Sequence, residues 1–138
     1  MVQKTRLFVY GTLRRDLGHP LHSFLKEHGR FIGLGTVQGK LVDLGSYPGL
    51  VRSDNPADRV LGEVFVLSLE PERVLRRLDE YEGCGDEEPL YRREKMTVSL
   101  DHGGQEQAWV YVFNGAATGR PEIASGDYVA YVASRSAV

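Results

Sequence analysis

Glycines recur at short intervals through one extended apolar segment of this chain, and they constrain its fold more than any other feature. The segment covers residues 31–44 and contains Gly33, Gly35 and Gly39. Glycine within a strand marks a bulge or a sharp bend, because it has no side chain to pack and allows unusual backbone angles. The spacing therefore predicts a strongly coiled sheet or a closed barrel.

Strand patterns dominate the rest of the chain, and two helical patterns lie between them. Apolar and β-branched residues predict strands over 5–10, 31–44, 60–67, 91–100, 105–113 and 128–133. Helices are predicted over 19–28 and 68–82, a turn over 45–49, a loop over 53–58, and a hairpin turn over 101–104. These elements predict an α+β fold, a small, mixed, strongly coiled β-barrel with flanking helices.

The size and charge of the chain limit what it can do. Its 138 residues suffice for one domain with a buried core, and no repeat or linker divides them, so residues 1–138 are predicted to form a single domain. A net charge of −2 with scattered basic residues gives no case for a nucleic-acid partner. No segment resembles a signal peptide or a membrane span, and there is a single cysteine, so we expect a cytoplasmic protein without a membrane partner. No dimer stripe is visible, and a monomer is the default expectation.

One carboxylate of the predicted helix 68–82 lies on its apolar side. Positions four apart share a helix face, so Glu82 follows Val74 and Leu78 on the apolar stripe, whereas Asp79 lies off it and is expected to be solvated. Partial burial and the negative end of the helix dipole should both raise the pKa of Glu82. A carboxyl group of this kind can take up and return a proton, as general acid–base catalysis requires. The alternative is that the helix ends at Tyr81 and Glu82 turns out to solvent.

The first predicted strand leads directly into a glycine turn, Tyr10-Gly11-Thr12-Leu13. Such a turn leaves backbone N–H groups that can receive a carboxylate or a developing oxyanion. It is not a phosphate-binding loop, because it lacks the lysine and the glycine spacing of one. A simple strand-ending turn is the alternative interpretation.

Six short motifs, taken in order, resemble those of the gamma-glutamylcyclotransferase family, in its subgroup of gamma-glutamylamine cyclotransferases and AIG2-like proteins. The resemblance covers roughly residues 5–133. In one place Tyr128 stands where many members carry tryptophan, and we interpret it as a packing residue. The motifs are Tyr10-Gly11-Thr12-Leu13-Arg14, Tyr47-Pro48-Gly49, Gly62-Glu63-Val64-Phe65, Leu78-Asp79-Glu80-Tyr81-Glu82-Gly83, Tyr91-Arg92-Arg93 and Gly126-Asp127-Tyr128.

The resemblance implies an enzyme that converts a small-molecule gamma-glutamyl amine or amino acid to 5-oxoproline and the free amine. It implies Glu82 as the general acid/base and the segment from Tyr10 through Gly11 and Thr12 to Leu13 as the substrate cradle, without a metal or cofactor. It also makes Tyr91 a candidate substrate-binding residue. Tyr111 is another candidate, because the aromatic residues of 109–113 alternate and so share one face of a strand. The alternative for both tyrosines is core packing with a satisfied hydroxyl.

Other readings of the sequence stay open. The same fold could serve as a non-enzymatic module that binds a small ligand, or it could hydrolyse or transfer a related amide. Cys84 has no adjacent histidine, and His19 and His22 have no obvious third ligand, so thiol and metal chemistry are not favoured. The segments 47–49 and 114–125 are expected to set the depth of the pocket and thus the amine that is released.

Overall fold

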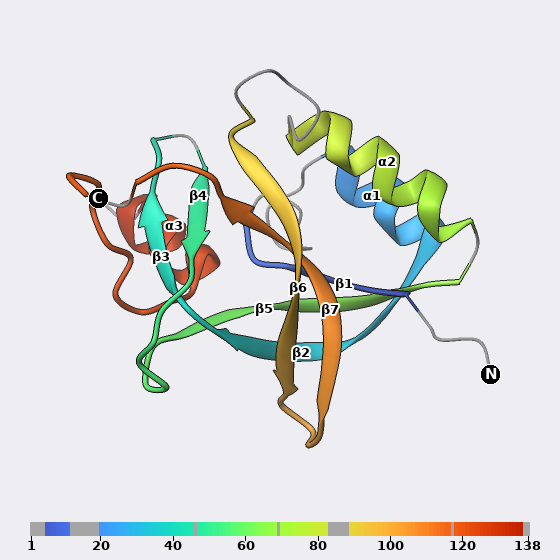
Figure 1. The fold of residues 1–138 in the computed structure, drawn as a ribbon, viewed down its shortest axis with the longest axis horizontal. Helices are drawn as coiled ribbons and strands as arrows, with labels where there is room; N and C mark the ends of the chain where they lie inside the picture. Colours follow the sequence, from blue (N-terminus) through green and yellow to red (C-terminus); the bar gives the residue numbers. More distant parts are fainter. Residues whose placement is uncertain are drawn as a thin grey trace.

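The computed structural model describes residues 5–11, 20–45, 47–68, 70–82, 89–116 and 118–136. Within them seven strands form one sheet with the order β1-β5-β2-β6-β7-β4-β3 (Figure 1). None of the described helices is both long and apolar enough to cross a membrane. The elements are β1 (Thr5–Val9), α1 (Pro20–His28), β2 (Gly29–Gln38), β3 (Lys40–Asp43), β4 (Pro48–Val51), β5 (Arg59–Leu67), α2 (Pro71–Glu82), β6 (Tyr91–Leu100), β7 (Gln105–Phe113) and α3 (Tyr128–Ser136).

The sheet closes on itself. β1 pairs in parallel with β7 at Leu7 and Trp109, so that β1, β5, β2, β6 and β7 form a mixed barrel. The hairpin of β3 and β4 extends the sheet through a parallel pairing of Leu50 with Val112. Since β6 occupies one edge of β7 along its whole length, β1 and β4 must share the other edge. The predicted fold class, a small mixed barrel with flanking helices, is confirmed.

The side chains of β1 point alternately to its two faces, and they contribute to two separate parts of the core. Phe8 and Tyr10 belong to a cluster inside the barrel, to which all five barrel strands contribute. Leu7 and Val9 point the other way, into a second cluster that α1 and α2 cover. Figure 1 shows these two helices together on one side of the barrel, with α3 at the far side beside β3 and β4. The closed barrel thus buries the inner face of its strands, and α1 and α2 bury only part of the outer face.

One glycine of residues 31–44, Gly33, lies at a bulge of the kind that was predicted. The register of β2 against β5 shifts between Phe31 and Gly33, which marks a bulge. The predicted turn over 45–49 is partly wrong, because β4 begins at Pro48 and includes Gly49. The short length of β4 explains the error, since four residues that begin with proline and glycine carry little strand signal.

The strand predicted over 128–133 is wrong, because these residues lie in α3. Their β-branched and aromatic side chains favour a strand, but Asp127 caps a helix here: its carboxylate accepts a hydrogen bond from the N–H of Ala130 (3.3 Å). Tyr128, Tyr131 and Val132, at helical spacing, pack against the barrel core. The Tyr131 hydroxyl also donates to Asp43 of β3 (2.6 Å). Tertiary packing and a cap therefore override the local propensity.

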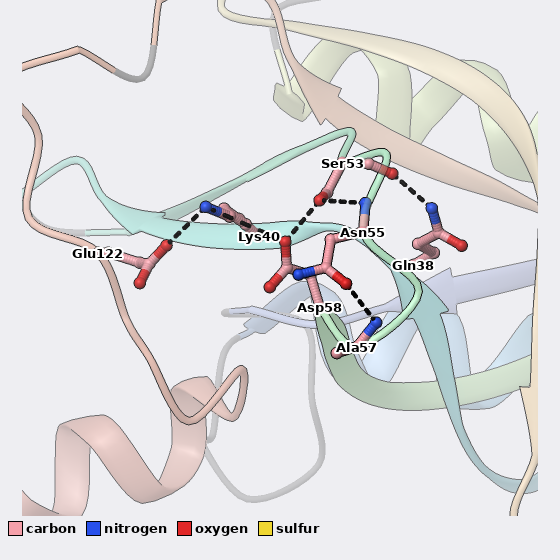
Figure 2. Close-up of polar contacts among 7 residues, drawn as sticks. All are labelled: Gln38, Lys40, Ser53, Asn55, Ala57, Asp58 and Glu122. Atoms are coloured by element: carbon pink, nitrogen blue, oxygen red, sulfur yellow. Dashed lines mark hydrogen bonds and ion pairs between the residues drawn. The ribbon is translucent and has the colours of Figure 1, made fainter.

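A polar cluster fixes the loop between β4 and β5 (Figure 2). The hydroxyl of Ser53 donates to the carboxylate of Asp58 (2.5 Å) and accepts from the N–H of Asn55 (3.1 Å). The ammonium group of Lys40 lies between Asp58 (4.0 Å) and Glu122 (3.5 Å). These contacts tie β3 both to the loop and to the segment that leads into α3, and they confirm the predicted loop over 53–58.

Candidate active site

A cavity of about 320 Å³ opens beside the end of β1, where β1 and β4 separate along the edge of β7. Four predicted site residues, from three separate parts of the sequence, meet in its wall. No described residue of 114–125 lines it, so the expected contribution of that segment to the pocket is wrong. The lining residues are Phe8, Val9, Tyr10 and Gly11 from the first strand and turn, Tyr47 and Pro48 from the β3–β4 hairpin, Tyr81 from α2, Leu90 and Tyr91 from the start of β6, and Tyr111 from β7.

Tyr10 joins three strands at the base of this cavity. Its hydroxyl donates to the carbonyl oxygen of Tyr111 (2.5 Å) and accepts from the N–H of Leu50 (3.1 Å). Both partners lie where β1 has left the edge of β7 and β4 is about to join it. The phenol therefore satisfies backbone groups that the gap in the ladder would otherwise leave to water, and its ring forms part of the cavity wall.

Tyr91 holds the other side of the hairpin. It is buried at the start of β6, and its hydroxyl donates to the carbonyl of Pro48 (2.6 Å). Its ring lies near that of Tyr47, with 6.5 Å between the ring centroids. The hydroxyl thus has a structural partner in the hairpin, and Tyr91 also lines the cavity.

Gly11 is required by a close approach. A methyl group added at this position would lie 2.8 Å from Cγ of Pro48, closer than carbon atoms tolerate. The turn after β1 therefore packs directly against the hairpin, and a side chain at position 11 would push the two apart. Thr12 and Leu13, which complete the predicted cradle, lie outside the described residues.

α2 ends at the cavity. It begins at Pro71, and Val74, Leu75 and Leu78 are buried against the barrel, as the apolar stripe predicts. Tyr81, the next member of the stripe, is 41% exposed and lines the cavity instead. Glu82 is the last residue of the helix, so the helix extends one residue beyond Tyr81, where the alternative interpretation ended it. The side chain of Glu82 is not among those that the structure describes.

Asp79 is not the solvated residue that the sequence suggested. Its carboxylate accepts hydrogen bonds from Nε (2.7 Å) and Nη2 (3.0 Å) of Arg93 and from the hydroxyl of Tyr111 (2.8 Å). The side chains of Asp79 and Arg93 are each only 24% exposed. Side chains along β6 alternate between two faces, so Arg93 lies on the same face as Tyr91 and hence towards α2. This pattern is visible in the sequence, but it does not show which acid of the helix Arg93 meets.

Metal chemistry finds no support in the described part of the chain, where no three His, Cys, Asp or Glu side chains are grouped so that they could hold an ion. Cys84 and His19, two residues considered for thiol or metal chemistry, lie outside the described residues, as does the side chain of His22.

Comparison with known proteins identifies the family. The family described as gamma-glutamyl cyclotransferase, AIG2-like, matches residues 7–130. The chain belongs to this family. The first relative, a gamma-L-glutamyl-butirosin B gamma-glutamyl cyclotransferase from Niallia circulans, is 38% identical over 109 residues, which are 78% of this chain and 66% of that protein. The gamma-glutamylaminecyclotransferase of Bos taurus is 37% identical over 103 residues, 69% of this chain and 56% of that protein. The chain thus spans slightly under two thirds of the first relative and about half of the second.

Comparison with solved structures agrees with the assignment of this chain to the gamma-glutamyl cyclotransferase family. The crystal structure of an AIG2-like protein from Mus musculus superposes with a TM-score of 0.71 at 28% identity, covering 92% of this chain and 89% of that one. The resemblance stated from the sequence motifs is therefore confirmed, and so is the assignment of the chain to a family of enzymes.

Proposed function

We propose that this protein cyclises a gamma-glutamyl amine or gamma-glutamyl amino acid to 5-oxoproline and releases the amine. The observation that carries the proposal is the cavity itself, which joins the Tyr10-Gly11 turn to the last turn of the helix that ends in Glu82. Its volume, about 320 Å³, is near the lower end of the roughly 300–1,000 Å³ typical of small-ligand sites. A group the size of a folded glutamyl residue suits such a space.

The reaction needs no nucleophile from the protein. The alpha-amine of the substrate attacks its own gamma-carbonyl carbon, a new C–N bond closes the five-membered ring, and the bond to the leaving nitrogen breaks. Before attack the alpha-ammonium group must lose a proton, and the departing amine must gain one. Binding the substrate in a folded conformation brings amine and carbonyl together, which supplies the proximity effect.

Glu82 is proposed to carry that proton as general acid/base. The C-terminus of α2 is the negative end of a helix dipole, which favours the protonated form of a carboxyl group and so favours a raised pKa there. A carboxyl group that titrates near neutrality accepts the proton of the alpha-ammonium group and returns it to the leaving nitrogen. The neighbouring Tyr81 already lies in the cavity wall.

The Tyr10-Gly11-Thr12-Leu13 turn is proposed to bind the glutamyl end of the substrate. Its backbone N–H groups would receive the alpha-carboxylate or the oxyanion that forms at the gamma-carbon. The contact of Gly11 with Pro48 keeps this turn close to the hairpin, and the buried tyrosines Tyr10, Tyr91 and Tyr111 give the cavity rigid walls. Rigid walls are what an intramolecular cyclisation requires of its binding site.

The mouth of the cavity is proposed to receive the amine. Tyr47, Tyr81 and Leu90 are the exposed large hydrophobic residues of the described chain, and all three line this cavity. Apolar side chains gathered at one opening commonly mark a binding surface. The released group would therefore lie against them, outside the part of the site that holds the glutamyl moiety.

The test is 5-oxoproline release from a panel of gamma-glutamyl amines and dipeptides. Wild type is compared with Glu82→Gln and with Glu80→Gln, which makes the same change at an exposed neighbouring carboxylate of α2. We expect activity in wild type and Glu80→Gln and its loss in Glu82→Gln, with circular dichroism unchanged. A wild type that is silent across the panel, yet is stabilised against heat by one of its members, would instead support a non-enzymatic binding module.

A further inference from the structure

We propose that Asp79 is a positioning residue that fixes the hydroxyl of Tyr111 as a hydrogen-bond acceptor for the substrate's alpha-ammonium group. The inference rests on the proposed function and extends it to a residue pair on the cavity wall. Tyr111 lines the cavity, and Asp79 acts through it from one turn before the end of α2.

The direction of the hydrogen bond decides the chemistry. A phenolic hydroxyl has one proton to donate and oxygen lone pairs with which to accept. The Tyr111 hydroxyl gives its proton to Oδ1 of Asp79 over 2.8 Å. Once that proton is committed, the oxygen can only accept, so it matches an ammonium donor and opposes a carbonyl or carboxylate.

Arg93 holds the carboxylate that takes this proton. The guanidinium contacts both oxygens of Asp79, through Nε (2.7 Å) and Nη2 (3.0 Å), a two-point geometry that fixes the plane of the carboxylate. The same guanidinium lies 4.4 Å from the ring centroid of Trp109. In the β6–β7 ladder Arg93 is also the direct cross-strand partner of Tyr111. The carboxylate of Asp79 therefore has one preferred position relative to the hydroxyl of Tyr111.

The position along α2 connects this pair with the proposed acid/base. Asp79 and Glu82 are three residues apart on one helix, and residues at this spacing are neighbours on the helix surface. An alpha-ammonium group bound at the Tyr111 oxygen would thus lie at the same end of the cavity as the last turn of α2. The oxygen of Tyr111 would orient the nitrogen that must be deprotonated before it attacks.

The experiment is a double-mutant cycle on gamma-glutamyl amide turnover, with Tyr111→Phe, Asp79→Ala and the two combined. We expect each single variant to lower kcat/KM by about tenfold, the range of one hydrogen bond to a charged group. The double variant should be no worse than Tyr111→Phe alone, because Asp79 acts through the hydroxyl. Asp79→Asn keeps an amide oxygen as acceptor and should lose only about threefold.

A second readout separates positioning from support of the fold. A glutaryl amide has the substrate's groups except the alpha-ammonium, so its inhibition constant should stay within about twofold of wild type in all variants. Glu94→Gln is the matched control, because Glu94 pairs with Arg52 at 2.7 Å and is 26% exposed, close to the 24% of Asp79, but does not line the cavity. Its kcat/KM should equal that of wild type.

The outcomes are distinct. Non-additive losses in kcat/KM with unchanged glutaryl amide binding support the inference. Wild-type kcat/KM in Asp79→Ala, multiplied losses in the double variant, or equally weakened glutaryl amide binding would overturn it while leaving the proposed function intact. A wild type that forms no 5-oxoproline overturns both. If Asp79→Ala does not fold, the cycle of Asp79→Asn with Tyr111→Phe is read by the same criterion.

Discussion

The hydroxyl of Tyr10 donates a 2.5 Å hydrogen bond to the carbonyl oxygen of Tyr111, 101 positions further along the chain. The same oxygen accepts the N–H of Leu50 at 3.1 Å. One phenol therefore bridges β1, β7 and β4 at the point where the barrel edge changes partner. The cavity exists because these strands diverge, and Tyr10 holds them at that divergence.

Tyr10→Phe should destabilise the protein although it removes a single oxygen atom. The change deprives a buried carbonyl and a buried N–H of this partner, and each unsatisfied group costs about 1–3 kcal/mol. We expect the free energy of unfolding to fall by about 2 kcal/mol in urea titration. Tyr47→Phe, at a residue that is 39% exposed, is the control and should change it by less than about 0.5 kcal/mol. Equal stability of Tyr10→Phe and wild type would show that the bridge contributes nothing.

Gly11→Ala should impair catalysis through a steric clash. The added methyl group would lie 2.8 Å from Cγ of Pro48, so that the turn and the hairpin must separate. Displacement of a substrate-binding turn by even about 1 Å can lower the rate by about a hundredfold. We therefore expect kcat/KM to fall at least tenfold, which corresponds to about 1.4 kcal/mol of activation free energy.

Pro48→Ala in the same chain provides the control for this clash, because it removes the atoms that the new methyl group meets. If the clash is the cause, the double variant should regain most of the activity that Gly11→Ala loses, relative to Pro48→Ala alone. An additive loss would mean that position 11 acts in another way.

The barrel could be predicted from the sequence because its signals are local. The glycines at 33, 35 and 39 indicated a coiled sheet. The strands over 91–100 and 105–113 have the predicted bounds. β4 and α3 were missed for opposite physical reasons. β4 is a strand by virtue of its pairing with β3 and β7, and α3 is a helix by virtue of the Asp127 cap and its packing.

The candidate site, too, could be predicted where its signals are local and was missed where it depends on tertiary contacts. Tyr10, Gly11, Tyr91 and Tyr111 were found as members of motifs or of an alternating strand, and the fold brings them together. Asp79 was misjudged because helix periodicity gives only the angle of a side chain about its helix. Which strand faces that angle depends on how α2 docks on the barrel, and only the structure shows Arg93 and Tyr111 there.

Asp127→Ala should weaken α3 without affecting the cavity. It removes the carboxylate that accepts the N–H of Ala130, and loss of such a cap costs about 1 kcal/mol. Asp127→Asn, which retains a capping oxygen, should cost less than half of that. Thermal unfolding measures both losses of stability. At a temperature at which both variants are fully folded, their kcat/KM should equal that of wild type. A selective loss of activity would place α3 closer to the chemistry than the structure does.

Substitutions at the mouth should change which amine is released rather than whether cyclisation occurs. Tyr81 and Leu90 are 41% and 36% exposed and line the cavity, so part of their apolar surface is available to a bound amine. Truncating either residue to alanine should raise KM for gamma-glutamyl amides of large apolar amines by about fivefold, the effect of uncovering part of one apolar side chain. The methylamide reaches no further than the glutamyl part of the site and should keep its wild-type KM. If KM rose equally for the small and the large amide, Tyr81 and Leu90 would shape the glutamyl site, and selection of the amine would have to be sought elsewhere.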